Sequence, residues 1–159
     1  MVTNPEKLHL QTVIDKKIAN CKSAAENKNI EIKSTVNENF YVKADEMMLK
    51  TVLLNLLSNA IKFSNQDGII EIGAKIKDKH VEVSIKDFGE GINETDLNKL
   101  FSIDSSVNLR GTNKEEVSGL GLILCKEFTE RNGGNIFVKS EKDKGSTFSF
   151  TVKRELEMI

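Results

Sequence analysis

The chain has 159 residues, of which 38% are hydrophobic and 30% charged, figures that suit one globular domain and exclude a disordered chain. Lysine and arginine total 23 and aspartate and glutamate 24, so the formal net charge is −1 and the basic excess of a nucleic-acid-binding protein is absent. The two cysteines, Cys21 and Cys125, have no metal-ligand spacing around them, which favours a reduced, cytoplasmic protein. No signal peptide is expected from the pattern of the first residues, and no apolar run reaches membrane-spanning length.

The spacing of apolar residues predicts three main helices. An amphipathic helix is expected over residues 4–28, with Pro5 in its first turn. Asp45 is expected to cap a second helix that runs to about Phe63. A third helix should end at the Gly133-Gly134 pair, because glycine commonly follows the last helical residue.

Alternation of apolar and polar residues predicts short strands between these helices. The expected strands cover residues 30–32, 41–42, 69–76, 80–87, 136–140 and 147–152. Leu97, Leu100 and Phe101 suggest a short helix, and residues 102–118 show no periodicity, which is typical of a functional lid or a plain surface loop. The order of elements predicts an α+β fold, in which about three helices cover one face of a mixed, mostly antiparallel sheet of about five strands.

Polar side chains form a stripe along the second helix, beside a broad apolar arc that must be buried. Asn55, Asn59 and Lys62 follow one another at i, i+4 and i+7, with Phe63 at the edge of the stripe. One interpretation is a solvated helix face. The other is a site for a hard cation and phosphates, in which the Asn59 carbonyl supplies an oxygen to Mg²⁺ and Lys62 contacts phosphate.

Two glycine-containing segments stand at the ends of predicted elements. Asp87-Phe88-Gly89-Glu90-Gly91-Ile92 follows a strand and places a carboxylate, able to accept from the amino group of adenine, beside residues that lack a Cβ. Ser118-Gly119-Leu120-Gly121-Leu122 opens the third helix, where unpaired backbone N–H groups favour anions such as a triphosphate. The ordinary alternatives are a turn for the first segment and a flexible helix entry for the second.

The segment Asn55-Leu56-Leu57-Ser58-Asn59-Ala60-Ile61-Lys62-Phe63-Ser64 resembles the N box of the ATP-binding catalytic domain of bacterial sensor histidine kinases. These domains have the Bergerat fold and share a superfamily with gyrase, mismatch-repair and heat-shock chaperone ATPases. The two glycine-containing segments resemble the family's G1 and G2 boxes, although Val117 replaces an often-present glycine. Phe101 resembles the F box, and Gly145-Ser146-Thr147-Phe148 resembles the G3 box. All five boxes occur in order, so the resemblance extends to nearly the whole chain.

The resemblance implies a site for ATP and Mg²⁺. Asn59 would bind the metal, Lys62 a phosphate and Asp87 the amino group of adenine. Residues 102–118 would form a flexible ATP lid, with Arg110 as a candidate contact of the γ-phosphate. The residues expected at the nucleotide are Asn59, Lys62, Phe63, Asp87, Gly89, Gly91, Ile92, Phe101, Arg110, Ser118, Gly119, Leu120, Gly121, Leu122 and Thr147.

Position 55 bears on the reaction that this site would carry out. Superfamily members that hydrolyse ATP typically place a glutamate four residues before the metal-binding asparagine. Asn55 occupies that catalytic position here, and an amide cannot take a proton. The family's phosphoacceptor is a histidine on a separate dimerisation domain, and neither His9 nor His80 fits its motif. The resemblance therefore implies a histidine protein kinase domain that transfers the γ-phosphoryl group to a histidine outside this chain.

The expected organisation is an N-terminal helix over 1–28 leading into a catalytic domain over 29–159, together one structural unit. The expected partners are ATP, the histidine-bearing dimerisation domain of the same parent kinase and a downstream response regulator, with no nucleic acid. The isolated domain is expected to be a cytoplasmic monomer, whether or not its parent is anchored in the inner membrane. Two alternatives stay open: a non-catalytic ATP-binding module of a degenerate kinase and, less favoured, an ATPase of the gyrase and chaperone type.

Overall fold

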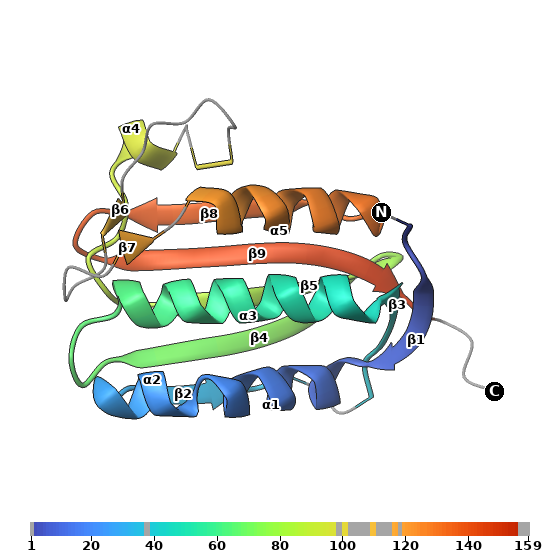
Figure 1. Cartoon of the computed structure of the whole chain (residues 1–159), viewed down its shortest axis with the longest axis horizontal. Coiled ribbons are helices and arrows are strands. Elements are labelled where there is room, and N and C mark those ends of the chain that lie inside the picture. Colours follow the sequence, from blue (N-terminus) through green and yellow to red (C-terminus); the bar gives the residue numbers. More distant parts are fainter. Residues whose placement is uncertain are drawn as a thin grey trace.

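Helices cover one face of a seven-stranded sheet in the computed structural model (Figure 1), which describes residues 2–36, 39–97, 100–101, 109–110, 116–117 and 119–155. The strands of this sheet are β1 (Pro5–His9), β2 (Glu31–Ser34), β3 (Tyr41–Asp45), β4 (Ile69–Lys77), β5 (His80–Asp87), β8 (Ile136–Glu141) and β9 (Gly145–Arg154). The helices are α1 (Leu10–Asn20), α2 (Lys22–Asn27), α3 (Glu46–Phe63), α4 (Glu94–Leu97) and α5 (Gly119–Arg131). Two further strands, β6 (Leu109–Arg110) and β7 (Glu116–Val117), pair with each other.

The sheet has the strand order β1-β3-β9-β5-β4-β2. On the edge of β9 that faces away from β5, β8 pairs with Gly145–Phe150 and β3 pairs with the last two residues. The described pairs are antiparallel except β2 with β4, which is parallel. Side chains alternate between the two faces of a strand, so Val81, Val83 and Ile85 of β5 are buried on the helix side, and the residues between them lie on the face without helices.

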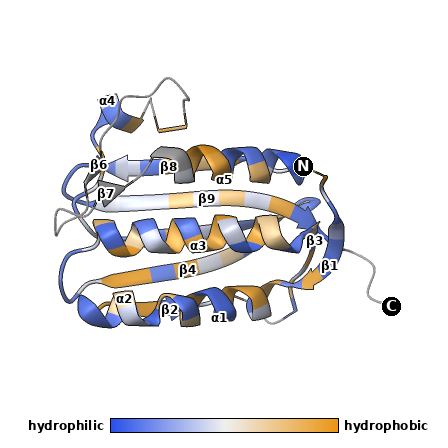
Figure 2. Cartoon of the chain, viewed as in Figure 1, coloured by the Kyte–Doolittle hydropathy of each residue, from blue (hydrophilic) through white to orange (hydrophobic). Residues whose placement is uncertain are grey.

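The core fills the space between this sheet and α1, α3 and α5. Leu53, Leu56 and Leu57 of the central helix α3 are fully buried, and each such side chain contributes about 1.5–3 kcal/mol when it leaves water. Hydrophobic residues recur along the helices and along β4 and β9 in Figure 2. Asp45 caps α3 as predicted, since its carboxylate accepts a hydrogen bond from the Met48 backbone N–H at 3.0 Å.

The first predicted helix is wrong over its first turns. Pro5–His9 forms β1, which pairs antiparallel with β3, and the helix begins only at Leu10. Pro5 is tolerated at the first residue of an edge strand because it needs no ladder donor there, and the buried side chain of Leu8 anchors the strand. The helix is also interrupted at Cys21, between α1 and α2.

The remaining elements agree with the predictions within a few residues. The sheet has seven strands instead of about five, because β1 joins the six predicted segments, and Leu100 and Phe101 lie outside the short helix α4 (Glu94–Leu97). The two-layer α+β architecture with helices on one face is confirmed. Of the proposed lid, residues 102–108, 111–115 and 118 lie outside the described residues. No helix within the described ranges is both long and apolar enough to cross a lipid bilayer.

Candidate nucleotide-binding site

Close backbone contacts bring the G1 segment against the end of the N-box helix. Gly89 lies against the last residue of α3, so that a Cβ added to it would clash with the carbonyl oxygen of Phe63. Ser64 ends α3 and is also in contact, with its Cα 3.1 Å from that added Cβ. Only a residue without a side chain fits here. The end of β5 and the end of α3 are thereby held side by side.

The start of α5 lies against the middle of α3. A Cβ added to Gly121 would lie 3.3 Å from Oδ1 of Asn55, closer than most Cβ contacts in proteins. Asn55 is half-buried and also contacts Cys125 on α5. Residues of the N box and of the G2 box, far apart in the sequence, therefore meet between two neighbouring helices (Figure 1).

Asp87, the last residue of β5, is the most unusual polar residue of this region. Only 1% of its surface is exposed. Its Oδ1 accepts a hydrogen bond from the Gly89 backbone N–H at 3.0 Å, whereas its buried Oδ2 has no hydrogen-bond partner. Burial raises the pKa of this carboxyl from 3.8 to about 6, although backbone hydrogen bonds from Gly89 and Ser146 lower it. A buried acceptor without a partner is costly, and the amino group of a ligand could satisfy it.

The hairpin of β8 and β9 fixes the rest of the G1 segment. The Ile92 backbone N–H donates to Oγ of Ser140 at 2.8 Å, and Ser140 Oγ donates in turn to the Gly145 carbonyl oxygen at 3.0 Å. Gly91 has a φ of 72° and Gly145 a φ of 108°, backbone conformations that favour glycine. The loop that follows Asp87 is therefore held by contacts with two other elements.

The polar stripe of α3 provides groups suited to a metal and to phosphate. Asn59 is 7% exposed, and the rest of the described chain gives its side chain no hydrogen-bond partner. Lys62, one turn further along, is half-buried. An amide oxygen is a ligand that Mg²⁺ accepts, with phosphate oxygens and water completing its octahedron. The donor set thus fits a magnesium ion that is held jointly by Asn59 and a bound phosphate chain.

Comparison with known proteins identifies the family of this chain. Residues 44–156 match the family described as histidine kinase-, DNA gyrase B-, and HSP90-like ATPase. The chain belongs to this family. It is 36% identical over 152 residues to the adaptive-response sensory kinase SasA of Prochlorococcus marinus (strain MIT 9313), covering 94% of this chain and 40% of that protein. The chain therefore spans about 40% of the length of this curated relative.

Solved structures of histidine kinases have the same fold as this ATPase-family chain. The catalytic domain of histidine kinase ThkA superimposes with a TM-score of 0.81 at 28% identity, covering 97% of both chains. ThkA in complex with the response regulator protein TrrA matches with a TM-score of 0.77 at 25% identity, over 99% of this chain and 44% of that chain. The fold class inferred from the sequence is thus confirmed, as is the likeness to histidine kinase catalytic domains.

The other residues expected at the nucleotide belong to several elements. Phe63, Ile92 and Leu122 are buried, and Phe101 is half-buried against the same core. A ligand could contact these buried side chains only from the side where the polar groups of the site lie. Arg110 lies in β6, Gly119 and Leu120 are the first residues of α5, and Ser118 is outside the described residues.

The register of β5 and β9 places one further residue, which the sequence did not indicate, beside Asp87. Ser146 lies directly opposite Asp87, and its backbone N–H helps to lower the pKa of the Asp87 carboxyl. Thr147, which we had selected, lies opposite the exposed Lys86 on the face without helices. The sequence signal that could have separated them is the alternation along β9, in which Phe148 and Phe150 share the face of Ser146.

A buried lysine is the second residue that the sequence did not reveal. Lys28 is 4% exposed, and its Nζ donates to the carbonyl oxygens of Ile61, Lys62 and Ser64 at 3.0, 3.0 and 3.2 Å. These carbonyls belong to the last turn of α3, where a helix leaves its C=O groups without partners. Lys28 therefore fixes the end of α3, against which Gly89 is packed. It follows the polar residues 26–27, and nothing in the sequence predicts its burial.

Proposed function

We propose that this chain binds Mg·ATP between α3, the end of β5 and the start of α5, and donates the γ-phosphoryl group to a histidine on a separate domain. The observation that carries the proposal is the buried Asp87 carboxylate, which keeps one oxygen without a hydrogen-bond partner beside the end of α3. The amino group of adenine is a donor that suits this acceptor. Family membership supports ATP binding by this chain.

Each remaining group has a role that follows from its chemistry. Asn59 would hold Mg²⁺, which would supply positive charge to offset the negative charge of the phosphates during phosphoryl transfer. Lys62 would contact a phosphate as a point charge. Gly121 lets the first turn of α5 approach α3 closely, so that its backbone N–H groups could receive the phosphate chain.

The reaction itself requires a nucleophile from outside the chain. Asn55 stands where an acid would activate water, and its amide cannot accept the proton. An acceptor histidine on a dimerisation domain of the same parent would attack the γ-phosphorus, and the protein contributes positioning and charge stabilisation.

Since ThkA forms a complex with the response regulator TrrA, we propose a response regulator as the downstream partner here. We also propose that 1–159 form one structural unit, because β1 and α1 pack with the rest of the fold, and that this unit is monomeric alone, because dimerisation belongs to the separate histidine-bearing domain.

Titration calorimetry with Mg·ATP tests the proposal. Asp87→Asn should weaken ATP binding by about tenfold or more, since a hydrogen bond to a charged group contributes roughly 1.5–3 kcal/mol. The exposed Asp78→Asn, in the β4–β5 turn, is the charge-matched control and should bind like the wild type.

A second nucleotide makes the test more specific. Guanine presents a carbonyl oxygen where adenine presents the amino group, so the wild type should reject GTP, and Asp87→Asn should lose part of this discrimination. Equal ATP affinity of the wild type and Asp87→Asn would remove Asp87 from the base pocket. ATP binding without phosphoryl transfer to a cognate dimerisation domain would favour the non-catalytic module, and sustained ATP hydrolysis by the chain alone would favour the ATPase.

A further inference from the structure

A straight row of basic residues crosses five strands on the face of the sheet without helices. Lys7 lies directly opposite Lys43, Lys43 opposite Lys153, Lys153 opposite His80, and His80 opposite Lys77. Directly opposed residues of antiparallel strands share one face, so the five side chains form a single line, which we call the cationic row. Its four lysines are exposed and His80 is half-buried.

The stability of the fold does not account for the cationic row. Like charges directly opposite each other on neighbouring strands are destabilising. Lysine on an edge strand can prevent aggregation through that edge, which would explain Lys7 on β1. It does not explain Lys153 and His80, because β9 and β5 lie in the interior of the sheet.

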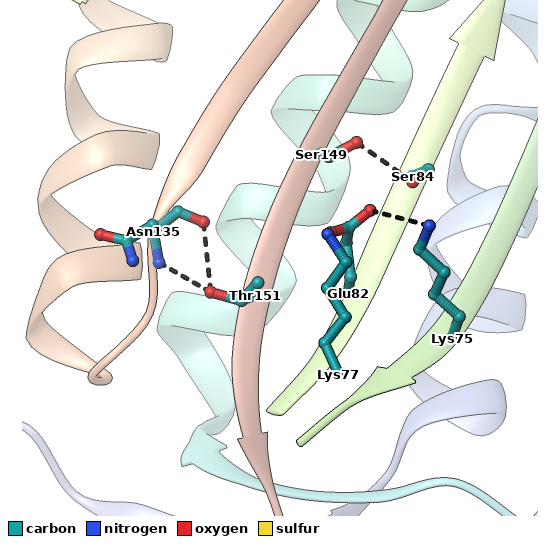
Figure 3. Close-up of polar contacts among 7 residues, drawn as sticks. All are labelled: Lys75, Lys77, Glu82, Ser84, Asn135, Ser149 and Thr151. Atoms are coloured by element: carbon teal, nitrogen blue, oxygen red, sulfur yellow. Dashed lines mark hydrogen bonds and ion pairs between the residues drawn. The ribbon is translucent and has the colours of Figure 1, made fainter. Parts of the chain in front are cut away.

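One end of the row forms ion pairs with a carboxylate of the sheet. Glu82 on β5 pairs with Lys77 of the row and lies 3.8 Å from Lys75, and Figure 3 shows both lysines beside its carboxylate, with the helices behind the sheet. At the middle of the row, no carboxylate of the described residues lies within ion-pair distance of Lys43 or Lys153. These two ammonium groups are therefore available to an external anion.

A pocket adjoins the row at the same two lysines. It has a volume of about 420 Å³ and is lined by Pro5, Lys43, Arg131, Asn132 and Lys153. The stem of Lys153 passes over Gly133, where an added Cβ would clash with it. Arg131 brings a third cation to the pocket, although its guanidinium also pairs with Glu127 at 3.0 Å. Three basic side chains thus converge on one opening.

The neighbouring histidine is held in place by the same turn. A ring nitrogen of His80, Nε2, lies 2.9 Å from the Gly133 carbonyl oxygen, to which it donates in the tautomer that carries hydrogen there. His80 begins β5 and Asp87 ends it, so the cationic row and the nucleotide site lie about 23 Å apart along the strand. The row is therefore separate from the site of the proposed function.

We propose that the cationic row docks an acidic α-helix of a partner protein. Neighbouring strands lie about 4.8 Å apart, so the four steps of the row span about 19 Å. Glutamates at i, i+4, i+7, i+11 and i+14 of a helix span about 21 Å, which flexible lysines can follow. Alternate residues of an extended acidic chain recur about every 6.7 Å and would span about 27 Å. The spacing therefore fits a helix better than an extended segment.

Two synthetic peptides of the same composition test this proposal by fluorescence anisotropy. One is a labelled helical peptide with five glutamates along one face in that pattern, and the other distributes the same glutamates around the helix. The patterned peptide should bind the chain at least about tenfold more tightly and lose affinity with added salt, because exposed charges are screened. Equal affinity of the two peptides, or no binding by either at millimolar concentration, would overturn the proposal.

A pair of double variants locates the binding surface. Lys43→Gln with Lys153→Gln should weaken the patterned peptide about tenfold, as expected for the loss of two exposed ion pairs. Lys16→Gln with Lys22→Gln changes the net charge equally on the helix layer and should bind like the wild type. Thermal melting should show the row variant to be at least as stable as the wild type, since it relieves like-charge repulsion. Undiminished peptide binding by a folded row variant would refute the docking surface, as would row-dependent capture by phosphatidylserine vesicles without peptide binding.

Discussion

Replacing Asp87 by asparagine should stabilise the fold while it weakens nucleotide binding. Burial raises the pKa of this carboxyl from 3.8 to about 6, so the folded chain binds a proton that the unfolded chain releases between these values. Stability therefore falls as the pH rises through this interval, and the full cost of the buried charge is present above pH 6. At 1.36 kcal/mol per pH unit of difference, that cost is about 3 kcal/mol.

The variant recovers most of this cost. Asparagine is neutral, and the favourable effect of the Gly89 and Ser146 backbone N–H groups on the charged form is already included in the raised pKa. The gain at pH 8 is therefore up to about 3 kcal/mol, or roughly 6–12 °C in melting temperature for a chain of this size.

Urea denaturation of the wild type and of Asp87→Asn between pH 4 and pH 8 measures this effect. The variant should be the more stable protein at pH 8, and the difference should shrink steadily below pH 6 as the wild-type carboxyl becomes protonated. Asp78→Asn provides the control, because its side chain is exposed, and should show no such pH-dependent gap. A variant that is less stable than the wild type at pH 8, or a gap independent of pH, would refute the argument from burial.

Gly89→Ala should abolish ATP binding and destabilise the fold by about 1–3 kcal/mol, because the new Cβ clashes with a backbone carbonyl of α3. Gly73→Ala, whose Cβ would make an ordinary contact at 3.6 Å, should leave both properties nearly unchanged. Lys28→Met should cost about 3 kcal/mol, since it leaves carbonyls at the end of α3 without a donor, whereas the exposed Lys22→Met should stay within about 0.5 kcal/mol. Asp45→Ala removes the cap of α3 and should cost about 1–2 kcal/mol with ATP affinity unchanged. Backbone hydrogen bonds lower the pKa of the Asp45 carboxyl below 3.8, so this cost should disappear only as the pH falls through that lowered pKa.

Chemical denaturation and calorimetry on the same preparations check these predictions. Full ATP affinity in Gly89→Ala would contradict the close packing of the G1 segment on α3. A Lys28→Met variant as stable as Lys22→Met would contradict the role of the buried ammonium in closing the helix. An Asp45 variant whose stability loss persists unchanged in strong acid would contradict the capping assignment.

The sequence predicts a helix or strand correctly where its determinants, such as a cap or an alternation of apolar residues, lie within a few residues of one another. Asp45 and the apolar arc behind it determine where α3 begins and which side it buries, and the alternation along β5 identifies its buried face. Pro5–His9 was predicted as helix because its strand conformation depends on pairing with β3, more than thirty residues away. Tertiary pairing overrides local helical spacing in such a case.

The sequence indicated candidate residues of the site but not the contacts that bring them together. The order of the boxes led to Asn59, Asp87 and the glycines, while the contact between Gly89 and the end of α3 is visible only in the folded chain. Ser146 was missed because one position along β9 separates the two faces of the sheet. Lys28 was missed because burial of a lysine depends on three carbonyl groups supplied by a distant helix.

A crystal structure of this chain with Mg²⁺ and a non-hydrolysable ATP analogue is the most direct test of the central claim. The account predicts that the adenine amino group donates to Oδ2 of Asp87, that Asn59 Oδ1 coordinates the metal, and that the phosphates lie near the first turn of α5. A nucleotide bound elsewhere, or bound here with Asp87 Oδ2 still without a partner, would contradict it.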